Sequence, residues 1–93
     1  MFKKVVVRMR EKVRRKEYVV TSHARKEMID ENFSVFDLES GILTSEILER
    51  QREKVTAEWK YRLKGKTISG DEIKLIAKFS PSDKLVIITV YEP

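Results

Sequence analysis

The sequence predicts an α+β domain in which two or three N-terminal helices pack on one face of a three- to four-stranded antiparallel sheet. Apolar residues recur at helical spacing in the first part of the chain, and they alternate with polar residues between positions 55 and 64. The chain closes with Leu85–Tyr91, a run dominated by β-branched and aliphatic residues that is typical of a central strand. Helices followed by consecutive strands are characteristic of the α+β class.

Composition indicates one ordered domain over residues 1–93, with 41% hydrophobic and 38% charged residues. The chain has no cysteine and a single histidine, which leaves too few ligands for a protein-built zinc site. We therefore expect no metal and no cofactor. No apolar run approaches the roughly 20 residues of a membrane helix, and the N-terminus lacks a signal-peptide core. These features predict a cytoplasmic protein without membrane association.

Positive charge is concentrated at the N-terminal end. Residues 1–26 contain ten Lys and Arg against two Glu, whereas residues 27–93 contain ten against 13 Asp and Glu. A basic end on a slightly acidic remainder favours a polyanion or an acidic protein as partner. A solvated basic face without a specific partner is the alternative.

The first elements are predicted to be helical. Residues 2–16 have the spacing of a basic amphipathic helix, although Val5 to Val7 would also suit an initial strand. Residues 18–21 are extended. Thr21 or Ser22 then caps a helix from about His23 to residue 31, whose buried row contains Ala24 and Met28.

A second short helix is predicted to start at Ser34, because Asp37 three residues later completes a capping box. Phe33 and Leu38 stand where a hydrophobic staple would close over this helix start, and Gly41 is expected to end the helix. The two short helices would form an αα-hairpin. Residues 42–51 suit either a continuation of the helix or a first strand.

Three strands are predicted after this point, at residues 55–64, 73–79 and 85–91, with turns at Gly65 to Asp71 and at residues 80–83. Alternation places two sets of side chains on opposite faces. The face toward the helices should contain Trp59, Tyr61, Leu63, Leu75, Ala77, Phe79, Val86, Ile88 and Val90. The other face should contain Lys60, Arg62, Lys74, Lys78, Thr89 and Tyr91, together with Leu85 and Ile87.

The chemistry available to this chain is one imidazole, His23, several cations and the hydroxyls of Thr89 and Tyr91. This set suits metal-free cleavage of an RNA phosphodiester: a base deprotonates the 2′-hydroxyl, cations hold the phosphate and an acid protonates the leaving oxygen. It suits passive phosphate binding equally well. The structural alternative makes Thr89 an ordinary strand residue, Tyr91 a terminal amphipathic one and His23 a residue at a helix start.

A set of short motifs resembles the domain of unknown function 4258 family. They are Thr21-Ser-His-Ala24, Met28, Phe33-Ser34 with Asp37, Gly41, Tyr61-Arg62-Leu63 and the final Ile88-Thr-Val-Tyr91. The resemblance covers residues 18–92 and leaves out the basic first helix over 1–16. Members of the family commonly have an arginine just before the second helix, where this chain has Glu31 and Asn32. If that arginine binds the scissile phosphate, this chain must use another cation or cut more weakly.

That family is similar to the RelE and MqsR toxins, so the resemblance implies a RelE-like fold and a metal-independent endoribonuclease toxin of a type II toxin–antitoxin pair. Four residues are then candidates for catalysis: His23, Tyr91, Arg62 and Thr89. Three more are candidates for holding phosphate or RNA: Lys60, Lys78 and Arg25. The implied partners are RNA, including ribosome-bound mRNA, and an antitoxin protein; a homodimer is also compatible. A non-catalytic module that binds RNA or an acidic protein is the alternative function.

Overall fold

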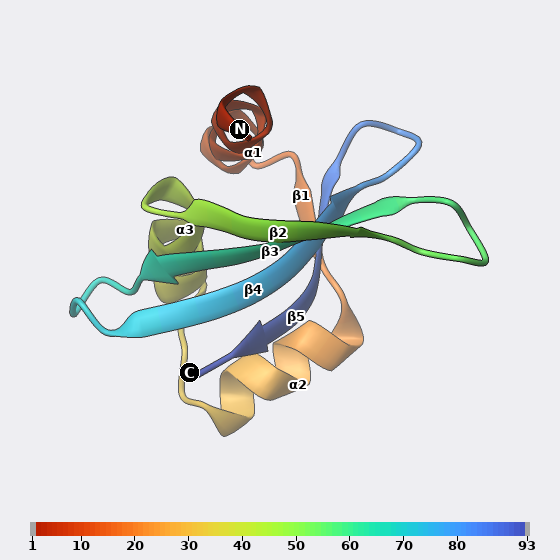
Figure 1. Ribbon diagram of the computed structural model, residues 1–93. Helices are drawn as coiled ribbons and strands as arrows, with labels where there is room; N and C mark the ends of the chain where they lie inside the picture. Colours follow the sequence, from red (N-terminus) through yellow and green to blue (C-terminus); the bar gives the residue numbers. More distant parts are fainter. Residues whose placement is uncertain (1, 93) are drawn as a thin grey trace.

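Three helices and five strands make up the fold in the computed structural model, which describes residues 2–92 (Figure 1). The helices are α1 (Lys3–Arg14), α2 (Ser22–Asp30) and α3 (Val35–Leu43). The strands are β1 (Tyr18–Val20), β2 (Glu46–Arg52), β3 (Trp59–Lys66), β4 (Glu72–Phe79) and β5 (Leu85–Tyr91). The α+β class and the basic first helix are thus confirmed, and none of the described helices has the length and apolarity needed to cross a membrane.

The sheet is mixed and five-stranded, in the order β1-β5-β4-β3-β2, so the prediction of a purely antiparallel sheet was wrong. Four of the strands form an antiparallel meander, and β1 pairs parallel to β5 through Val19 opposite Val86. The predicted extended segment before α2 therefore becomes an edge strand. Because β5 is apolar on both faces, it accepts a second partner along its first half and lies in the interior of the sheet.

A β-bulge in β5 changes which side chains face the helices. Ile76 of β4 pairs with Thr89, but Ala77 pairs with Ile87, so Ile88 is an extra residue in the ladder. Leu85 and Ile87 are consequently buried in the core, where the prediction had placed them on the opposite face. After the bulge the phase is the predicted one: Val90 is buried, and Thr89 lies on the other face. Because nearly every residue of β5 is apolar, the sequence does not show at which position the side chains change face.

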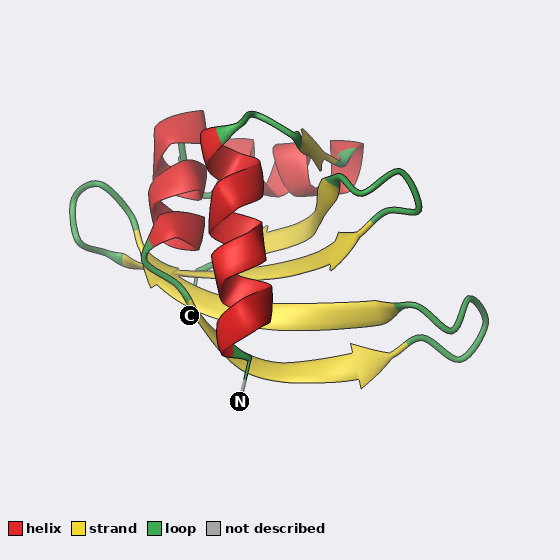
Figure 2. Ribbon diagram, turned by 90° about the horizontal axis from the view of Figure 1, so that it is seen from above, coloured by secondary structure: helices red, strands yellow, loops and turns green. Residues whose placement is uncertain are grey.

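The core lies between the sheet and the helices α1 and α3, which pack against each other as well as against the strands (Figure 2). Its fully buried side chains come from α1, α3 and the three strands β3, β4 and β5. The largest are Met9, Val13, Leu38, Ile42, Leu63, Ile73, Leu75, Leu85, Ile87 and Val90. Helix α2 instead lies along the second half of β5, beyond the end of β1, and adds Ala24 and Met28 to the core.

Two glycines allow α3 to lie directly on β3, and neither has the role that the sequence suggested. Gly41 is inside α3, which continues to Leu43, and Gly65 is inside β3 rather than in a turn. A Cβ at Gly65 would lie 1.9 Å from the carbonyl oxygen of Gly41, which is far too close for any side chain. The missing Cβ is therefore a packing requirement of the helix–sheet contact.

The β2–β3 hairpin extends away from the helices (Figures 1 and 2), and its second strand covers residues 59–66 instead of the predicted 55–64. Val55 and Ala57 belong to its loop, because β3 begins only at Trp59. Val55 is 90% exposed, and Ala57 has a positive φ of 59°. Val55 and Ala57 alternate with polar residues in the same way as the residues of β3 do, but they lie outside the strand.

The capping box of α3 is present as predicted. The Ser34 hydroxyl accepts a hydrogen bond from the amide of Asp37 (3.1 Å), and the Asp37 carboxylate accepts one from the amide of Ser34 (3.0 Å). The amide of Ile68 in the β3–β4 turn also donates to Asp37 (3.2 Å), which ties this turn to the helix start. These amide donors, that of Ser34 first, lower the pKa of Asp37 below its ordinary value.

We expect this helix start to make folding stability depend on acid pH. Because the pKa of Asp37 is lower in the folded than in the unfolded chain, its stabilisation is complete above the unfolded value of about 3.9 and is lost as the pH falls through the folded value. Urea unfolding at a series of pH values should therefore show a shallower acid decline for Asp37→Asn than for the unmodified chain. Ser34→Ala should cost about 1 kcal/mol at neutral pH. Equal acid declines for both chains would contradict this role of Asp37.

Candidate functional site

The open face of the sheet carries the polar rows that the sequence predicted. In the ladder, Lys74 lies opposite Tyr91 and Lys78 lies opposite Val86, on the face away from the core residues Leu75 and Ala77. Lys60, Arg62 and Thr89 share this face, because they alternate with buried neighbours in β3 and β5. Each of these side chains is partly buried.

Part of this face is hollowed to a volume of about 240 Å³. Lys60 and Arg62 of β3 and Thr89 of β5 contribute to its walls, so three of the predicted residues are brought together. Glu49 and Glu53, from β2 and the hairpin loop, line it as well and were not foreseen as part of a site. The hollow is therefore lined by carboxylates as well as by cations.

Glutamates pair with the cations of this face. The pairs are Lys60 Nζ–Glu53 Oε2 at 2.9 Å, Arg62 Nε–Glu49 Oε1 at 3.3 Å and Lys78 Nζ–Glu58 Oε2 at 3.2 Å. The hydrogen bond from Lys60 is the main cause that lowers the pKa of Glu53, which favours the charged form of this carboxyl group. The Nε of Arg62 is buried without a well-aligned hydrogen bond. A phosphate entering the hollow must therefore displace carboxylates from the cations it binds.

Lys74 differs from these three cations, and it was not among the candidate site residues. No carboxylate in residues 2–92 lies within 4 Å of its Nζ, whereas Lys64, its cross-strand neighbour, contacts both Glu46 and Glu72. Lys74 faces Tyr91 directly across the β4–β5 ladder. This pairing depends on the bulge at Ile88, which no sequence pattern marks, so periodicity alone did not single out Lys74.

The imidazole of His23 lies at the sheet edge rather than behind the sheet. Its side chain is 68% exposed, and Nε2 lies 3.2 Å from Oε1 of Glu27, one helical turn further along α2. The same oxygen accepts a hydrogen bond from the amide of Val90 at 3.2 Å. One carboxylate oxygen thus joins the imidazole to the backbone between Thr89 and Tyr91.

Helix α2 replaces β1 as the hydrogen-bonding partner along the second half of β5. The Thr21 hydroxyl donates to the carbonyl of Ile88 at 3.2 Å and also caps α2 by accepting from the amide of Ala24 at 3.1 Å. Glu27 satisfies the amide of Val90 on the same edge. Glu27 was not predicted as a site residue, since a Glu four residues after a His on a helix is an ordinary surface pair.

Arg25 does not join the other candidates. It lines a separate groove between β1, α2 and α3, together with Val19 and Ile29, on the other flank of the buried row of α2. The structure therefore brings together Lys60, Arg62 and Thr89, places His23 beside the end of β5, and leaves Arg25 apart.

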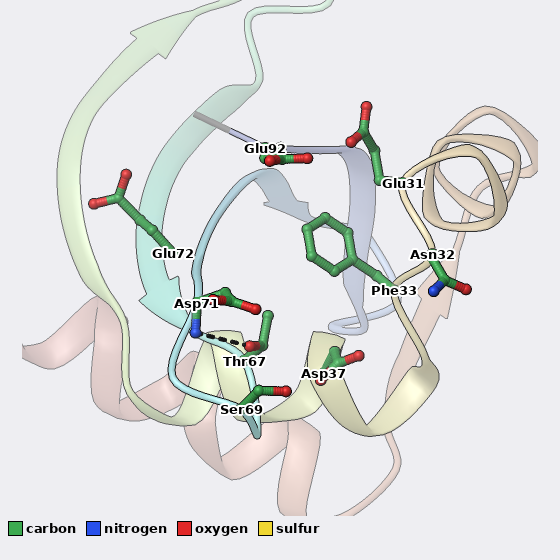
Figure 3. Close-up of a pocket in the computed structure, with 9 residues that line it drawn as sticks. All are labelled: Glu31, Asn32, Phe33, Asp37, Thr67, Ser69, Asp71, Glu72 and Glu92. Atoms are coloured by element: carbon green, nitrogen blue, oxygen red, sulfur yellow. Dashed lines mark hydrogen bonds between the residues drawn. The ribbon is translucent and has the colours of Figure 1, made fainter.

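A second cleft, of about 490 Å³, lies between the α2–α3 junction and the β3–β4 turn (Figure 3). In the part of the chain that the structure describes, five carboxylates and no cation line it. They are Glu31, Asp37, Asp71, Glu72 and Glu92. A hydrogen bond with Glu92 raises the pKa of Glu31. Among the described residues no group of His, Asp or Glu is arranged to hold a metal ion, and the acidic walls would repel a phosphate.

Asn32, which replaces the expected arginine, also lines this acidic cleft rather than the hollow on the sheet. It has a positive φ of 59° and ends α2 in a Schellman motif, in which the amide of Phe33 bonds to the carbonyl of Met28. Asparagine tolerates this left-handed conformation better than most residues. The local backbone thus provides a physical reason for asparagine at this position.

The fold and the face together define a small α+β domain whose mixed sheet has one buried and one highly charged surface. Within that class, the sequence pattern of the family described as Domain of unknown function (DUF4258) matches residues 20–92, and the chain belongs to this family. The boundaries agree with the resemblance over residues 18–92. No curated protein and no solved structure shows a significant match to the chain.

Proposed function

We propose that this chain is a metal-independent endoribonuclease toxin of a type II toxin–antitoxin pair, similar to RelE and MqsR. The observation that supports this most is the contact of the imidazole–carboxylate pair with the end of β5. Nε2 of His23 lies 3.2 Å from Oε1 of Glu27, and the same oxygen accepts a hydrogen bond from the amide of Val90, between the two hydroxyl residues Thr89 and Tyr91. A base held by a carboxylate is a recurring arrangement in acid–base catalysis.

The proposed reaction is an attack of a ribose 2′-oxygen on the adjacent phosphorus. His23 removes the 2′-proton, the bond to the 5′-oxygen breaks, and Tyr91 donates a proton to that leaving oxygen. The products are a 2′,3′-cyclic phosphate and a 5′-hydroxyl. Arg62 and Lys74 stabilise the extra negative charge on the phosphate, and Thr89 orients the group that it contacts.

The remaining candidates bind the RNA chain away from the cleaved bond. Lys60 and Lys78 extend along the open face, and Arg25 lies on the far flank of α2, where it would contact only a longer RNA. The toxin assignment further implies an antitoxin that blocks this face or α2. Ribosome-bound mRNA is included as a substrate in this proposal.

The test is incubation of purified protein with RNA, free and on ribosomes, in the presence of a chelator. We expect cleavage that leaves 2′,3′-cyclic phosphate ends. RNA of the same sequence with 2′-O-methyl groups lacks the nucleophile and should remain intact. Cleavage of the methylated RNA, or the absence of cleavage in both forms, would refute the proposed reaction.

A second function, RNA binding without catalysis, is favoured by the ion pairs of the open face. Lys60, Arg62 and Lys78 already form ion pairs with carboxylates. A surface that only binds RNA can function with its cations paired in this way. In that case the affinity for RNA falls with salt, as phosphate contacts require, but no product forms.

Glu49→Gln should strengthen RNA binding, because it releases the guanidinium of Arg62 for a phosphate. We expect the dependence of log affinity on log salt to steepen by about one. Glu11→Gln changes the net charge equally, but it acts on α1, where Glu11 pairs with Arg15. Fluorescence anisotropy over a salt series compares the two variants. Equal slopes for Glu49→Gln and Glu11→Gln would show that Arg62 makes no local phosphate contact.

A further inference from the structure

We propose that the free edge of β1 and the apolar groove beside it bind an extended, acidic segment of a partner protein, which adds to the sheet as a sixth strand. The proposal concerns a surface on the other flank of α2 from His23 and does not depend on RNA cleavage. Four features carry it: the open backbone of β1, the difference between the two sheet edges, the apolar groove and its positive charge.

Only alternate residues of β1 form hydrogen bonds to β5, so the amides and carbonyls of the other residues point away from the sheet. The amide of Leu85 donates to the carbonyl of Glu17, and the amide of Thr21 donates to the carbonyl of Ile87. In a parallel ladder these bonds alternate, so Val19 faces β5 and the amides and carbonyls of Tyr18 and Val20 point to the open edge. These are the groups that an added strand would pair with.

The two edges of the sheet are protected to different degrees. At one edge, β2 carries four charged residues, a common means of preventing unwanted strand pairing. At the other edge, β1 has the sequence Tyr-Val-Val, and Val19 is 45% exposed. The first edge is thus guarded by charge, whereas the second is short, apolar and open.

A groove of about 650 Å³ lies alongside this edge, between α2 and α3. Ile29 of α2 and Val35 of α3 line it and are 73% and 45% exposed, and Met28 lies almost buried within it. Side chains on one face of an added strand would fill this groove and remove the apolar surface from water. The groove therefore suits alternating apolar residues.

The charge of the groove determines which kind of partner segment it can bind. Among residues 2–92, the charged residues that line the groove are Lys16 and Arg25, and both are cations. Lys16 also contacts Glu39 at 2.6 Å, whereas no carboxylate in residues 2–92 lies within 4 Å of the Arg25 guanidinium. An acidic segment is complementary to this pair. A second copy of the chain is a poor occupant, because a twofold contact would place these cations against their own equivalents.

The test is a selection of short random peptides displayed on phage, with the purified chain as the target and Ile29→Glu as the counter-target. We expect the selected peptides to alternate Asp or Glu with apolar residues. Their affinity should fall at least tenfold for Ile29→Glu and for Arg25→Glu. Val55→Glu, at a position that is 90% exposed in the β2–β3 loop, adds the same charge elsewhere and should bind normally. Amide NMR shifts should be largest at Tyr18 and Val20.

A backbone readout tests strand addition itself. Peptides methylated on alternate amide nitrogens should lose binding in one phase of methylation and keep it in the other. The proposal is overturned if no peptide is selected, if the selected peptides lack acidic residues, or if both phases bind equally. It is also overturned if sedimentation shows a dimer of the chain that Ile29→Glu converts to a monomer, since a second copy would then occupy the groove.

Discussion

Gly65→Ala is expected to prevent stable folding. The added methyl group would lie 1.9 Å from the carbonyl oxygen of Gly41 and 2.7 Å from its carbonyl carbon, and both are backbone atoms of α3. Relief requires that α3 move away from β3, which would open the packing of Leu38 and Ile42 against the sheet. Overpacking in a core costs about 1–3 kcal/mol, and a backbone collision belongs at or above the upper end of that range.

Urea unfolding followed by circular dichroism measures this cost, and the other glycines provide matched controls. At Gly41 a methyl group would meet Ile73 Cγ2 at 2.7 Å, the end of a side chain that can move, so Gly41→Ala should be milder. At Gly70 nothing lies within 4 Å, but φ is +89°, so Gly70→Ala should cost only the backbone strain of about 1 kcal/mol. A Gly65→Ala protein as stable as Gly70→Ala would refute the close contact of α3 with β3.

These glycines also show where sequence reasoning ends. Gly41 and Gly65 were interpreted as a helix stop and a turn, because local rules connect glycine with chain breaks. Their actual role depends on a contact between two elements that are distant in sequence. The capping box at Ser34 and Asp37, in contrast, was predicted correctly because all of its partners lie within one turn of helix.

In the sheet, too, local features were predicted correctly, whereas features that depend on distant contacts were missed. Alternation in β3 and β4 located Lys60, Arg62 and Lys78 on one face, since a half-buried strand shows its two sides in its sequence. In β5 nearly every residue is apolar, so nothing marked the bulge at Ile88, and Leu85 was assigned to the wrong face. The parallel pairing of β1 was missed because a segment of three residues has no period to read.

The candidate site was predictable in its residue types but not in its electrostatics. Thr89 and Tyr91 were expected on the cationic face, and the register of β5 with β4 agrees with that expectation. The carboxylates that pair with the cations come from β2, whose structure the sequence left ambiguous, and from the β2–β3 loop, part of which was predicted as strand. Glu27 was overlooked because its second hydrogen bond, from Val90, joins two elements that only the fold brings together.

His23→Ala should abolish most RNA cleavage if the proposed reaction is correct. Loss of a general base lowers the rate by about 10²–10⁴-fold, and Tyr91→Phe, which removes the proposed acid, should have an effect in the same range. Because the two residues act on one transition state, the double variant should be little worse than either single one. The His23 side chain is 68% exposed, so its removal should change the free energy of unfolding by no more than about 0.5 kcal/mol.

The readouts of this experiment separate catalysis from structure. Free imidazole added to His23→Ala should restore part of the cleavage, because an exposed position admits a small base, whereas it should not restore cleavage by Tyr91→Phe. Glu27→Gln retains an oxygen that can accept from the amide of Val90, so it should lower the rate less than His23→Ala does. RNA affinity should be unchanged in all three variants. If His23→Ala cuts RNA as fast as the unmodified chain, the imidazole has no catalytic role, and the open face remains a binding surface only.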